Sequence, residues 1–206
     1  GFADHIIVDS TFAIRIPSEL KSAHAAPMMC GGITVFTPLY KYAKPGDKVG
    51  IIGLGGLGHF AVLFADAMGC DVTVFSTSPE KENEAYALGA NRFTTDVDES
   101  VDVIINTAPA GLPWGKYVGA LRPKGTFVQV GASPEPISVE SFSLLSADKK
   151  VVGSHIGSPQ LLRTMLRFSA SNQVEPNIEL FGMEDVNEAI QHVKDGNARY
   201  RAVLER

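Results

Sequence analysis

Six consecutive residues, 53–58, read Gly-Leu-Gly-Gly-Leu-Gly and satisfy the spacing G-x-G-x-x-G. In that pattern the first glycine permits a tight turn, the second lets the backbone approach a pyrophosphate, and the third allows close helix–strand packing. The amides that begin the following helix face the phosphates with the positive end of the helix dipole. Ligand-free structural turns share the pattern, but here an apolar run precedes it and a helical pattern follows it, as a dinucleotide site requires. We therefore predict a dinucleotide-binding turn made of Gly53, Leu54, Gly55, Gly56, Leu57 and Gly58.

The residues after the next predicted strand decide which dinucleotide this turn suits. An NAD site usually places Asp or Glu there, to accept hydrogen bonds from the ribose 2′-hydroxyl. Here residues 72–75 are followed by Ser76, Thr77 and Ser78, with Lys81 close behind. Hydroxyl donors and a cation suit a 2′-phosphate, so the sequence predicts NADP rather than NAD. The alternative is that Ser78 merely caps a helix, with Pro79 at its first position, and Lys81 is a solvated surface lysine.

A regular alternation of short apolar strands and helices must position these residues. The sequence predicts strands at residues 49–52, 72–75, 101–106, 125–131 and 150–154, and helices at residues 58–68, 79–88, 113–121 and 159–168. A buried helix interrupted near Pro27 and the pair Gly31 and Gly32 is expected before the first strand. Short buried strands that alternate with helices indicate βαβ units in a parallel sheet. We expect the α/β class, with a doubly wound parallel sheet of the Rossmann type.

The two ends of the chain do not continue this alternation. Residues 1–16 predict two short strands, and residues 178–181 and 200–204 predict strands on either side of an amphipathic helix. We expect a nucleotide-binding domain at residues 23–171, flanked by residues 1–22 and 172–206 as two separated pieces of a second domain. Because Gly1 opens the chain within a strand pattern, we expect a fragment of a longer protein.

Composition excludes several classes of protein. The 206 residues are 45% hydrophobic and 20% charged, which is the balance of an ordinary globular protein. A net charge of −5 without a basic cluster argues against a nucleic-acid partner. Apolar stretches end well short of the roughly 20 residues that span a bilayer. We also expect no secretory signal, because no basic region precedes an apolar one. Two cysteines do not make a disulfide framework, so we expect a cytoplasmic location.

Several separate motifs together resemble one family. They are Ala-Pro-Met-Met-Cys-Gly-Gly-Ile-Thr-Val at residues 26–35, Gly-Leu-Gly-Gly-Leu-Gly-His at 53–59, Ser-Thr-Ser-Pro-Glu-Lys at 76–81, and Arg-Tyr-Arg-Ala-Val-Leu at 199–204. The chain is similar in these motifs to the zinc-dependent medium-chain alcohol dehydrogenases, and most similar to their NADP-dependent cinnamyl alcohol dehydrogenase group. The resemblance implies a Rossmann domain inserted into a GroES-like catalytic domain. It also implies that this chain corresponds to the C-terminal part of such an enzyme.

The resemblance gives Cys30 a role that its position alone does not. In the family, a cysteine matching Cys30 is one of three protein ligands of a catalytic Zn²⁺, the others coming from an N-terminal region that this sequence lacks. Such a tetrahedral site keeps one position open for substrate. Taken alone, a single cysteine in an apolar stretch is more often an inert buried residue. We expect one ligand by itself to hold no zinc.

The resemblance also extends the set of cofactor-binding residues. Residues 106–107 and 130–132 follow strand ends, where open α/β sheets bind ligands. Many relatives have an aromatic residue in place of His155, so its role at the substrate is an open question. For Arg201, the alternative to a contact with a cofactor phosphate is a surface arginine on a closing strand. The further residues implied are Thr34, Asn106, Thr107, Val130, Gly131, Ala132, His155, Ile156, Gly157 and Arg201.

The function implied is interconversion of primary alcohols and aldehydes by hydride transfer, with NADP(H) and Zn²⁺ in the intact enzyme. We expect this chain alone to bind NADPH without dehydrogenase activity. The family usually forms homodimers by joining sheets edge to edge, and residues 150–154 are the candidate edge strand. Two alternatives stay open: a zinc-free quinone or enoyl reductase on the same fold, and a non-catalytic NADPH-binding module.

Overall fold

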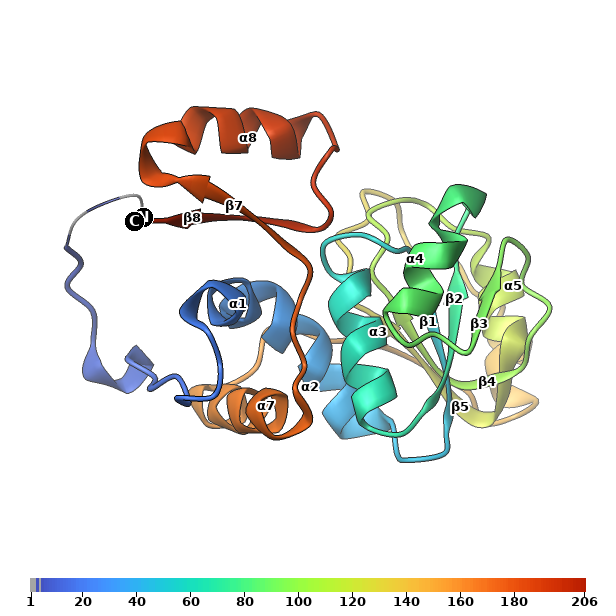
Figure 1. Ribbon diagram of the computed structural model, residues 1–206. Helices are drawn as coiled ribbons and strands as arrows, with labels where there is room; N and C mark the ends of the chain where they lie inside the picture. Colours follow the sequence, from blue (N-terminus) through green and yellow to red (C-terminus); the bar gives the residue numbers. More distant parts are fainter. Residues whose placement is uncertain (1–2, 4) are drawn as a thin grey trace.

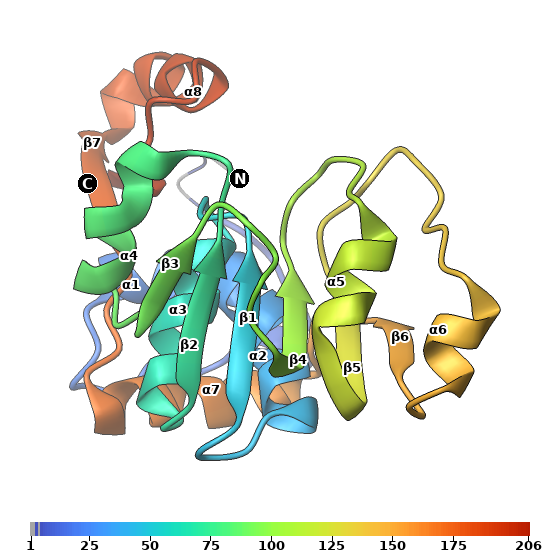
Figure 2. The same cartoon turned by 90° about the vertical axis from the view of Figure 1, so that its right-hand side faces the viewer.

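The computed structural model describes residue 3 and residues 5–206, and its main feature is a six-stranded parallel sheet. The strand order is β3-β2-β1-β4-β5-β6, which Figure 2 shows from left to right. The chain adds β2 and β3 on one side of β1 and then β4, β5 and β6 on the other, so the predicted doubly wound sheet is confirmed. The strands are β1 (Lys48–Ile52), β2 (Asp71–Phe75), β3 (Arg92–Thr94), β4 (Val101–Asn106), β5 (Leu121–Gln129) and β6 (Lys150–Gly153).

Helices cover both faces of this sheet. Helices α2, α3 and α7 pack on one face and α5 on the other (Figure 2). Ser158 caps α7 as its hydroxyl accepts a hydrogen bond from the backbone N–H of Leu161 at 3.2 Å. The helices are α1 (Ser22–Pro27), α2 (Ile33–Tyr42), α3 (Gly58–Ala67), α4 (Glu82–Ala87), α5 (Trp114–Ala120), α6 (Ser141–Leu145), α7 (Pro159–Asn172) and α8 (Val186–Lys194).

The core divides into two clusters because successive strand residues point to opposite faces of the sheet. On β4, Val103 and Ile105 belong to the cluster under α2, α3 and α7, whereas Ile104 belongs to the cluster under α5. In the larger cluster Phe36 and Phe64 meet edge to face, with ring centroids 5.2 Å apart. Strands buried on both faces are what the nearly continuous apolar runs predicted.

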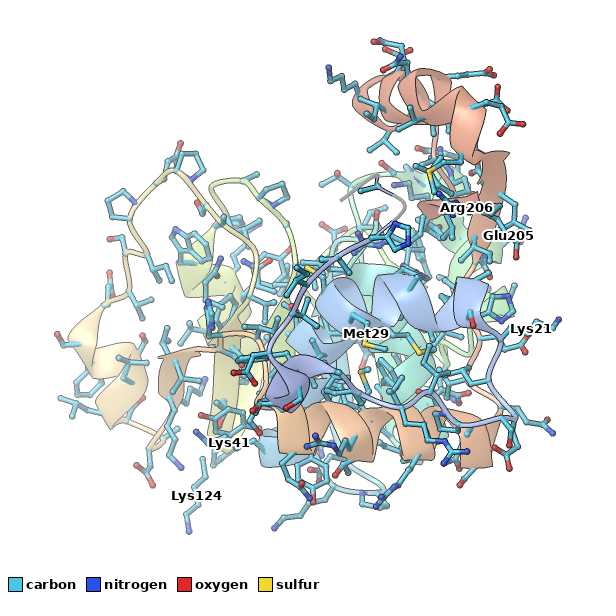
Figure 3. All side chains as sticks on the ribbon, turned by 90° about the vertical axis from the view of Figure 1, so that its left-hand side faces the viewer. Lys21, Met29, Lys41, Lys124, Glu205 and Arg206 are labelled. Carbon is cyan, nitrogen blue, oxygen red and sulfur yellow. The ribbon has the colours of Figure 1, made fainter. Side chains whose placement is uncertain are left out.

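A second, two-stranded parallel sheet lies beside the main one. It pairs β7 (Ile178–Gly182) with β8 (Arg201–Glu205), and α8 connects them (Figure 1). Figure 3 shows Glu205 and Arg206 where β8 ends, away from Lys124 at the opposite, lower end of the main sheet. The predicted strand–helix–strand tail is confirmed. How the chain divides into domains stays a prediction, with boundaries near residues 22 and 171.

Two groups of expectations need correction. The two strands expected within residues 1–16 are wrong for residues 5–16, which hold only the 3₁₀ turn η1 (Ser10–Phe12); residues 1, 2 and 4 lie outside the described part. This segment has only one sheet-forming feature, loose alternation, and its Ile7 and Phe12 stay exposed without a partner strand to cover them. Strand β3 and helix α6 were not predicted, because three and five residues are too few to establish a period.

The predicted interruption between α1 and α2 is a π-helical turn, η2 (Met28–Gly32). A π-turn inserts one extra residue into a helix and changes the direction of the side chains that follow. Figure 3 labels Met29 on this segment. Within the described residues, no helix is long and apolar enough to cross a membrane.

Candidate dinucleotide-binding site

A cavity of about 600 Å³ opens where the carboxyl ends of β1, β2 and β4 meet. Strand β1 has β2 on one side and β4 on the other, so the chain changes direction at this point of the sheet. Open α/β sheets bind ligands in the crevice at such a switch point. The lining residues are Ile52, Gly53, Leu54, Gly55, Gly56, Leu57, Phe75, Ser76, Thr77, Ser78, Lys81, Thr95, Thr107, Ala108, Pro109, Leu112, Tyr117, Gly131, Ala132 and Arg201.

Each glycine of the predicted turn has its own physical reason. Gly53 has a φ of +83°, a conformation that side chains rarely adopt. A Cβ on Gly58 would overlap the carbonyl oxygen of Gly53, so α3 can begin this close to β1 only with glycine. A Cβ on Gly55 would meet no described atom within 4 Å, which leaves its backbone open to the cavity. The Thr107 hydroxyl donates to the carbonyl oxygens of Ile52 (2.8 Å) and Gly53 (3.1 Å), fixing the turn against β4.

The three hydroxyls and the lysine predicted to select NADP line this same cavity. Lys81 Nζ donates to the carbonyl oxygen of Leu54 at 2.9 Å, so the lysine lies beside the glycine turn rather than free in solvent. The backbone N–H of Ser78 donates to Ser76 Oγ at 3.2 Å. Ser78 occupies the N-cap of the 3₁₀ turn η3 (Pro79–Lys81), but its side chain makes no capping bond to the described backbone. Its hydroxyl is therefore available to a ligand.

Arg201 reaches the cavity from β8, the strand of the small sheet. Its Nε donates to the carbonyl oxygen of Gly56 at 2.9 Å, and its guanidinium carbon lies 5.7 Å from the centroid of the Phe60 ring. A Cβ on Gly31 would collide with this guanidinium, and a Cβ on Gly56 would lie only 3.1 Å from its carbon. Burial lowers the pKa of Arg201, while the nearby Cys30 thiol raises it. The alternative of a surface arginine is therefore wrong, since the guanidinium lines the cavity beside the glycine turn.

Several predicted cofactor residues do not line the cavity. Buried Asn106 joins β4 to β5, as its Nδ2 donates to Gln129 Oε1 at 2.8 Å. The Thr34 hydroxyl donates to the carbonyl oxygen of Cys30 at 2.6 Å, within its own helical segment. The loop after β6 packs against α2, where a Cβ on Gly157 would meet Thr37 Oγ1 at 2.6 Å. Outside the cavity are thus Thr34, Gly58, Asn106, Val130, His155, Ile156 and Gly157.

The lining residues that were not predicted to bind the cofactor include Thr95, Leu112 and Tyr117. Tyr117 is 8% exposed and meets Phe75 edge to face, with centroids 5.7 Å apart. Burial raises the pKa of its hydroxyl. Its position on the predicted helix at residues 113–121 was the available signal, but periodicity does not tell which helix face meets a cavity. Thr95 and Leu112 lie in loops after strands, where the sequence sets no period.

Comparison with known proteins identifies the family of this chain. The family model described as zinc-binding dehydrogenase matches residues 56–171, which is more than half of the chain. The chain belongs to the zinc-binding dehydrogenase family. It is 41% identical over 214 residues to the NADP-dependent alcohol dehydrogenase C 1 of Mycolicibacterium smegmatis, covering 100% of this chain and 61% of that protein. It is 38% identical over 213 residues to the aldehyde reductase AdhA of Synechocystis, covering 99% of this chain and 63% of that one.

Solved structures of the zinc-binding dehydrogenase family share the fold described above. A cinnamyl alcohol dehydrogenase from Sorghum bicolor superposes with a TM-score of 0.86 at 38% identity, over 93% of this chain and 57% of that one. The Helicobacter pylori cinnamyl alcohol dehydrogenase complexed with NADP(H) gives 0.77 at 33% identity, over 92% and 56%. The chain thus spans about three fifths of the length of the curated relatives it matches, such as 61% and 63% of the two above.

A zinc-binding dehydrogenase needs three protein ligands around a catalytic Zn²⁺. Within the described residues, no group of three or more His, Cys, Asp or Glu side chains could hold a metal ion. Cys30 is exposed in the π-turn η2, so the alternative of an inert buried cysteine is wrong. The residues that the structure describes therefore do not by themselves complete a zinc site.

Proposed function

We propose that this chain is the NADP-binding part of a zinc-dependent dehydrogenase that interconverts primary alcohols and aldehydes by hydride transfer. The observation that carries the proposal is the charge of the cavity. Lys81 and Arg201 line it, and none of the described residues around it is Asp or Glu, although the whole chain has a net charge of −5. Two cations and three hydroxyls suit a dinucleotide that carries an additional 2′-phosphate.

Each part of the cofactor has residues suited to it. The pyrophosphate would be held by the glycine turn at Gly55, by the backbone N–H groups that begin α3 and by Arg201. Ser76, Thr77, Ser78 and Lys81, which follow β2, would hold the 2′-phosphate. When bound, NADP supplies or accepts the hydride. We assign the nicotinamide to the side of the cavity formed by Thr107, Gly131 and Ala132; a role for Thr34, His155, Ile156 and Gly157, which lie outside the cavity, stays a prediction.

Cys30 is proposed as one ligand of Zn²⁺ in the longer protein. Its exposure in η2 leaves the thiol accessible to further ligands, and the next residue, Gly31, packs against the guanidinium of Arg201, which lines the cavity. With one candidate ligand, we expect the 206-residue chain to bind NADPH without reducing aldehydes. Aldehyde reduction by this chain alone would contradict the assignment of zinc as a required partner.

Calorimetric titration of the chain with NADPH and NADH tests the proposed function. We expect NADPH to bind at least about tenfold more tightly, because a charge-assisted hydrogen bond to the 2′-phosphate contributes about 1.5–3 kcal/mol. Adenosine 2′-monophosphate, which carries only the adenosine and the 2′-phosphate, should compete with NADPH. Equal affinity for NADPH and NADH would refute the cofactor choice, and absence of binding by both would refute the site.

We further propose that two copies pair through β6. This strand is one of the two edges of the main sheet, and the neighbouring helix α6 exposes Phe142 (76%) and Leu145 (77%). An unpaired edge beside apolar side chains favours a symmetric contact with a second copy. Sedimentation should detect a dimer that Phe142→Asp with Leu145→Asp weakens; a monomer at high concentration would refute it. A cytoplasmic location stays a prediction.

A further inference from the structure

Arg201 reaches the cavity from a strand outside the six-stranded sheet. The hydrogen bond from Arg201 to Gly56 joins residues 145 positions apart in the sequence. Strand β8, which carries Arg201, pairs with β7 and not with the six-stranded sheet. A long arginine side chain loses considerable rotational freedom when it is fixed in one place. Other contacts must therefore hold β8 against the nucleotide-binding sheet.

Tyr200, the residue before Arg201, makes those contacts. It is 6% exposed, and its hydroxyl donates to Glu84 Oε2 on α4. The carboxylate of Glu84 also lies 3.7 Å from the guanidinium Nε of Arg199. Because Glu84 follows closely after Lys81 and the hydroxyls of the 2′-phosphate side, one hydrogen bond links that side of the cavity to β8.

His59 stacks against one face of the Tyr200 ring. The two rings stack with centroids 4.9 Å apart and planes inclined by 14°, and His59 also lies 4.3 Å from Phe60. His59 is fully buried on the first turn of α3, with Nδ1 3.2 Å from the carbonyl oxygen of Gly55. Its Nε2 has no hydrogen-bond partner among the described residues.

Desolvation explains why an imidazole is tolerated beside a cation here. Burial lowers the pKa of His59, and the charge of the nearby Arg201 adds a smaller effect in the same direction; together they bring the pKa to about 4. The ring is therefore neutral at pH 7 and does not repel the guanidinium. It offers Tyr200 a flat surface directly behind the glycine turn.

We propose that Glu84 and His59 hold Tyr200 and thereby position Arg201 on the glycine turn for the pyrophosphate of the bound dinucleotide. Tyr200 directly precedes the first residue of β8, so fixing its ring restrains the backbone from which Arg201 extends. Glu84, His59 and Tyr200 are positioning residues that act through Arg201. This inference rests on the proposed function, since it concerns how the same site receives its ligand.

The test compares NADPH affinity with affinity for adenosine 2′-monophosphate, which lacks the pyrophosphate. Tyr200→Phe keeps the stacked ring and removes the hydroxyl; it should weaken NADPH by about 2- to 30-fold, the usual range for a residue that acts through another. Binding of adenosine 2′-monophosphate should stay unchanged. Glu84→Ala should behave like Tyr200→Phe, and Glu84→Gln, which keeps an acceptor oxygen, should restore most of the affinity.

Two further variants separate positioning from general loss of structure. In an Arg201→Gln background, Tyr200→Phe should cause no additional loss of NADPH affinity, because the residue through which it acts is gone. Tyr86→Phe is the matched control, since Tyr86 also lies on α4 and its hydroxyl donates to Glu82 at 3.3 Å, but it is exposed. We expect Tyr86→Phe to bind both ligands like the wild type.

The remaining outcomes contradict either the positioning role of Tyr200 or the proposed function. Additive losses in the double variant, or equal losses for NADPH and adenosine 2′-monophosphate, would overturn the positioning role. If the wild type binds NADPH and Tyr200→Phe binds it equally well, this inference is wrong and the proposed function is not affected. Failure of the wild type to bind NADPH would overturn the proposed function and this inference with it.

Discussion

Replacing Lys81 by alanine should separate the two nicotinamide dinucleotides. Lys81 Nζ lies 2.9 Å from the carbonyl oxygen of Leu54 and lines the cavity next to Ser76, Thr77 and Ser78. An ammonium group has three N–H donors, so it keeps the bond to Leu54 while it donates to a phosphate. The alanine variant therefore loses a charge-assisted bond with NADPH, and loses none with NADH.

The size of the effect follows from that single bond. A hydrogen bond to a charged group contributes about 1.5–3 kcal/mol, which corresponds to about 10- to 150-fold in the dissociation constant. Calorimetry of wild type and Lys81→Ala with each dinucleotide measures both constants directly. The NADPH constant should rise by that factor, and the NADH constant should change less than about twofold. Higher salt should reduce the difference, because ions screen the phosphate.

Lys116→Ala is the matched control for the loss of one positive charge. Lys116 is exposed on α5 and lies outside the residues that line the cavity. It should leave both constants unchanged, and thermal unfolding should show that Lys81→Ala stays folded. Equal weakening of NADPH and NADH in Lys81→Ala, or the same loss in Lys116→Ala, would refute the 2′-phosphate assignment.

Three further predictions follow from packing and burial. Gly55→Ala should keep the unfolding free energy within about 0.5 kcal/mol yet abolish NADPH binding in calorimetry, since its Cβ would enter the open cavity. Gly58→Ala should lower the unfolding free energy by about 1–3 kcal/mol, because its Cβ would overlap the backbone. Equal stability of the two variants would contradict this. The pKa of His59 falls from 6.5 to about 4 on folding, so the unfolded chain binds more protons between these values; about 3 kcal/mol of stability should be lost as the pH falls from 7 to 4. In urea unfolding at several pH values, His59→Gln should lack this part of the pH dependence of the unfolding free energy. An equal pH dependence in the wild type and in His59→Gln would refute the prediction. Phe64→Ala removes a fully buried ring and should cost about 3–5 kcal/mol in the same assay, a loss below 1 kcal/mol being inconsistent with the packing.

The sequence predicted the sheet well because its strands are buried on both faces. Short, largely apolar runs such as residues 101–106 are typical of strands buried on both faces, and β4 occupies those residues. The glycine turn was also predictable, since each glycine answers a local requirement of backbone geometry. Residues 5–16 were not, because loose alternation does not reveal whether a partner strand is present.

The candidate site was predicted less evenly. Ser76, Thr77, Ser78 and Lys81 follow one strand end closely, so local order sufficed to bring them together. Arg201 entered only through a resemblance, and its contact with Gly56 depends on how a distant strand folds back. The support of Tyr200 by Glu84 and His59 could not be predicted, because those three residues come from three separate elements.

The separate origin of Arg201 has a consequence for motion. The pair β7 and β8 makes a sheet of two strands, and such small units open more readily than a six-stranded core. Every opening withdraws Arg201 from the cavity, so a bound dinucleotide that contacts this residue must dissociate or hold the small sheet closed. Ligand binding stabilises whichever form binds it. Amide hydrogens of β7, which line no part of the cavity, should therefore exchange with solvent more slowly once NADPH is bound.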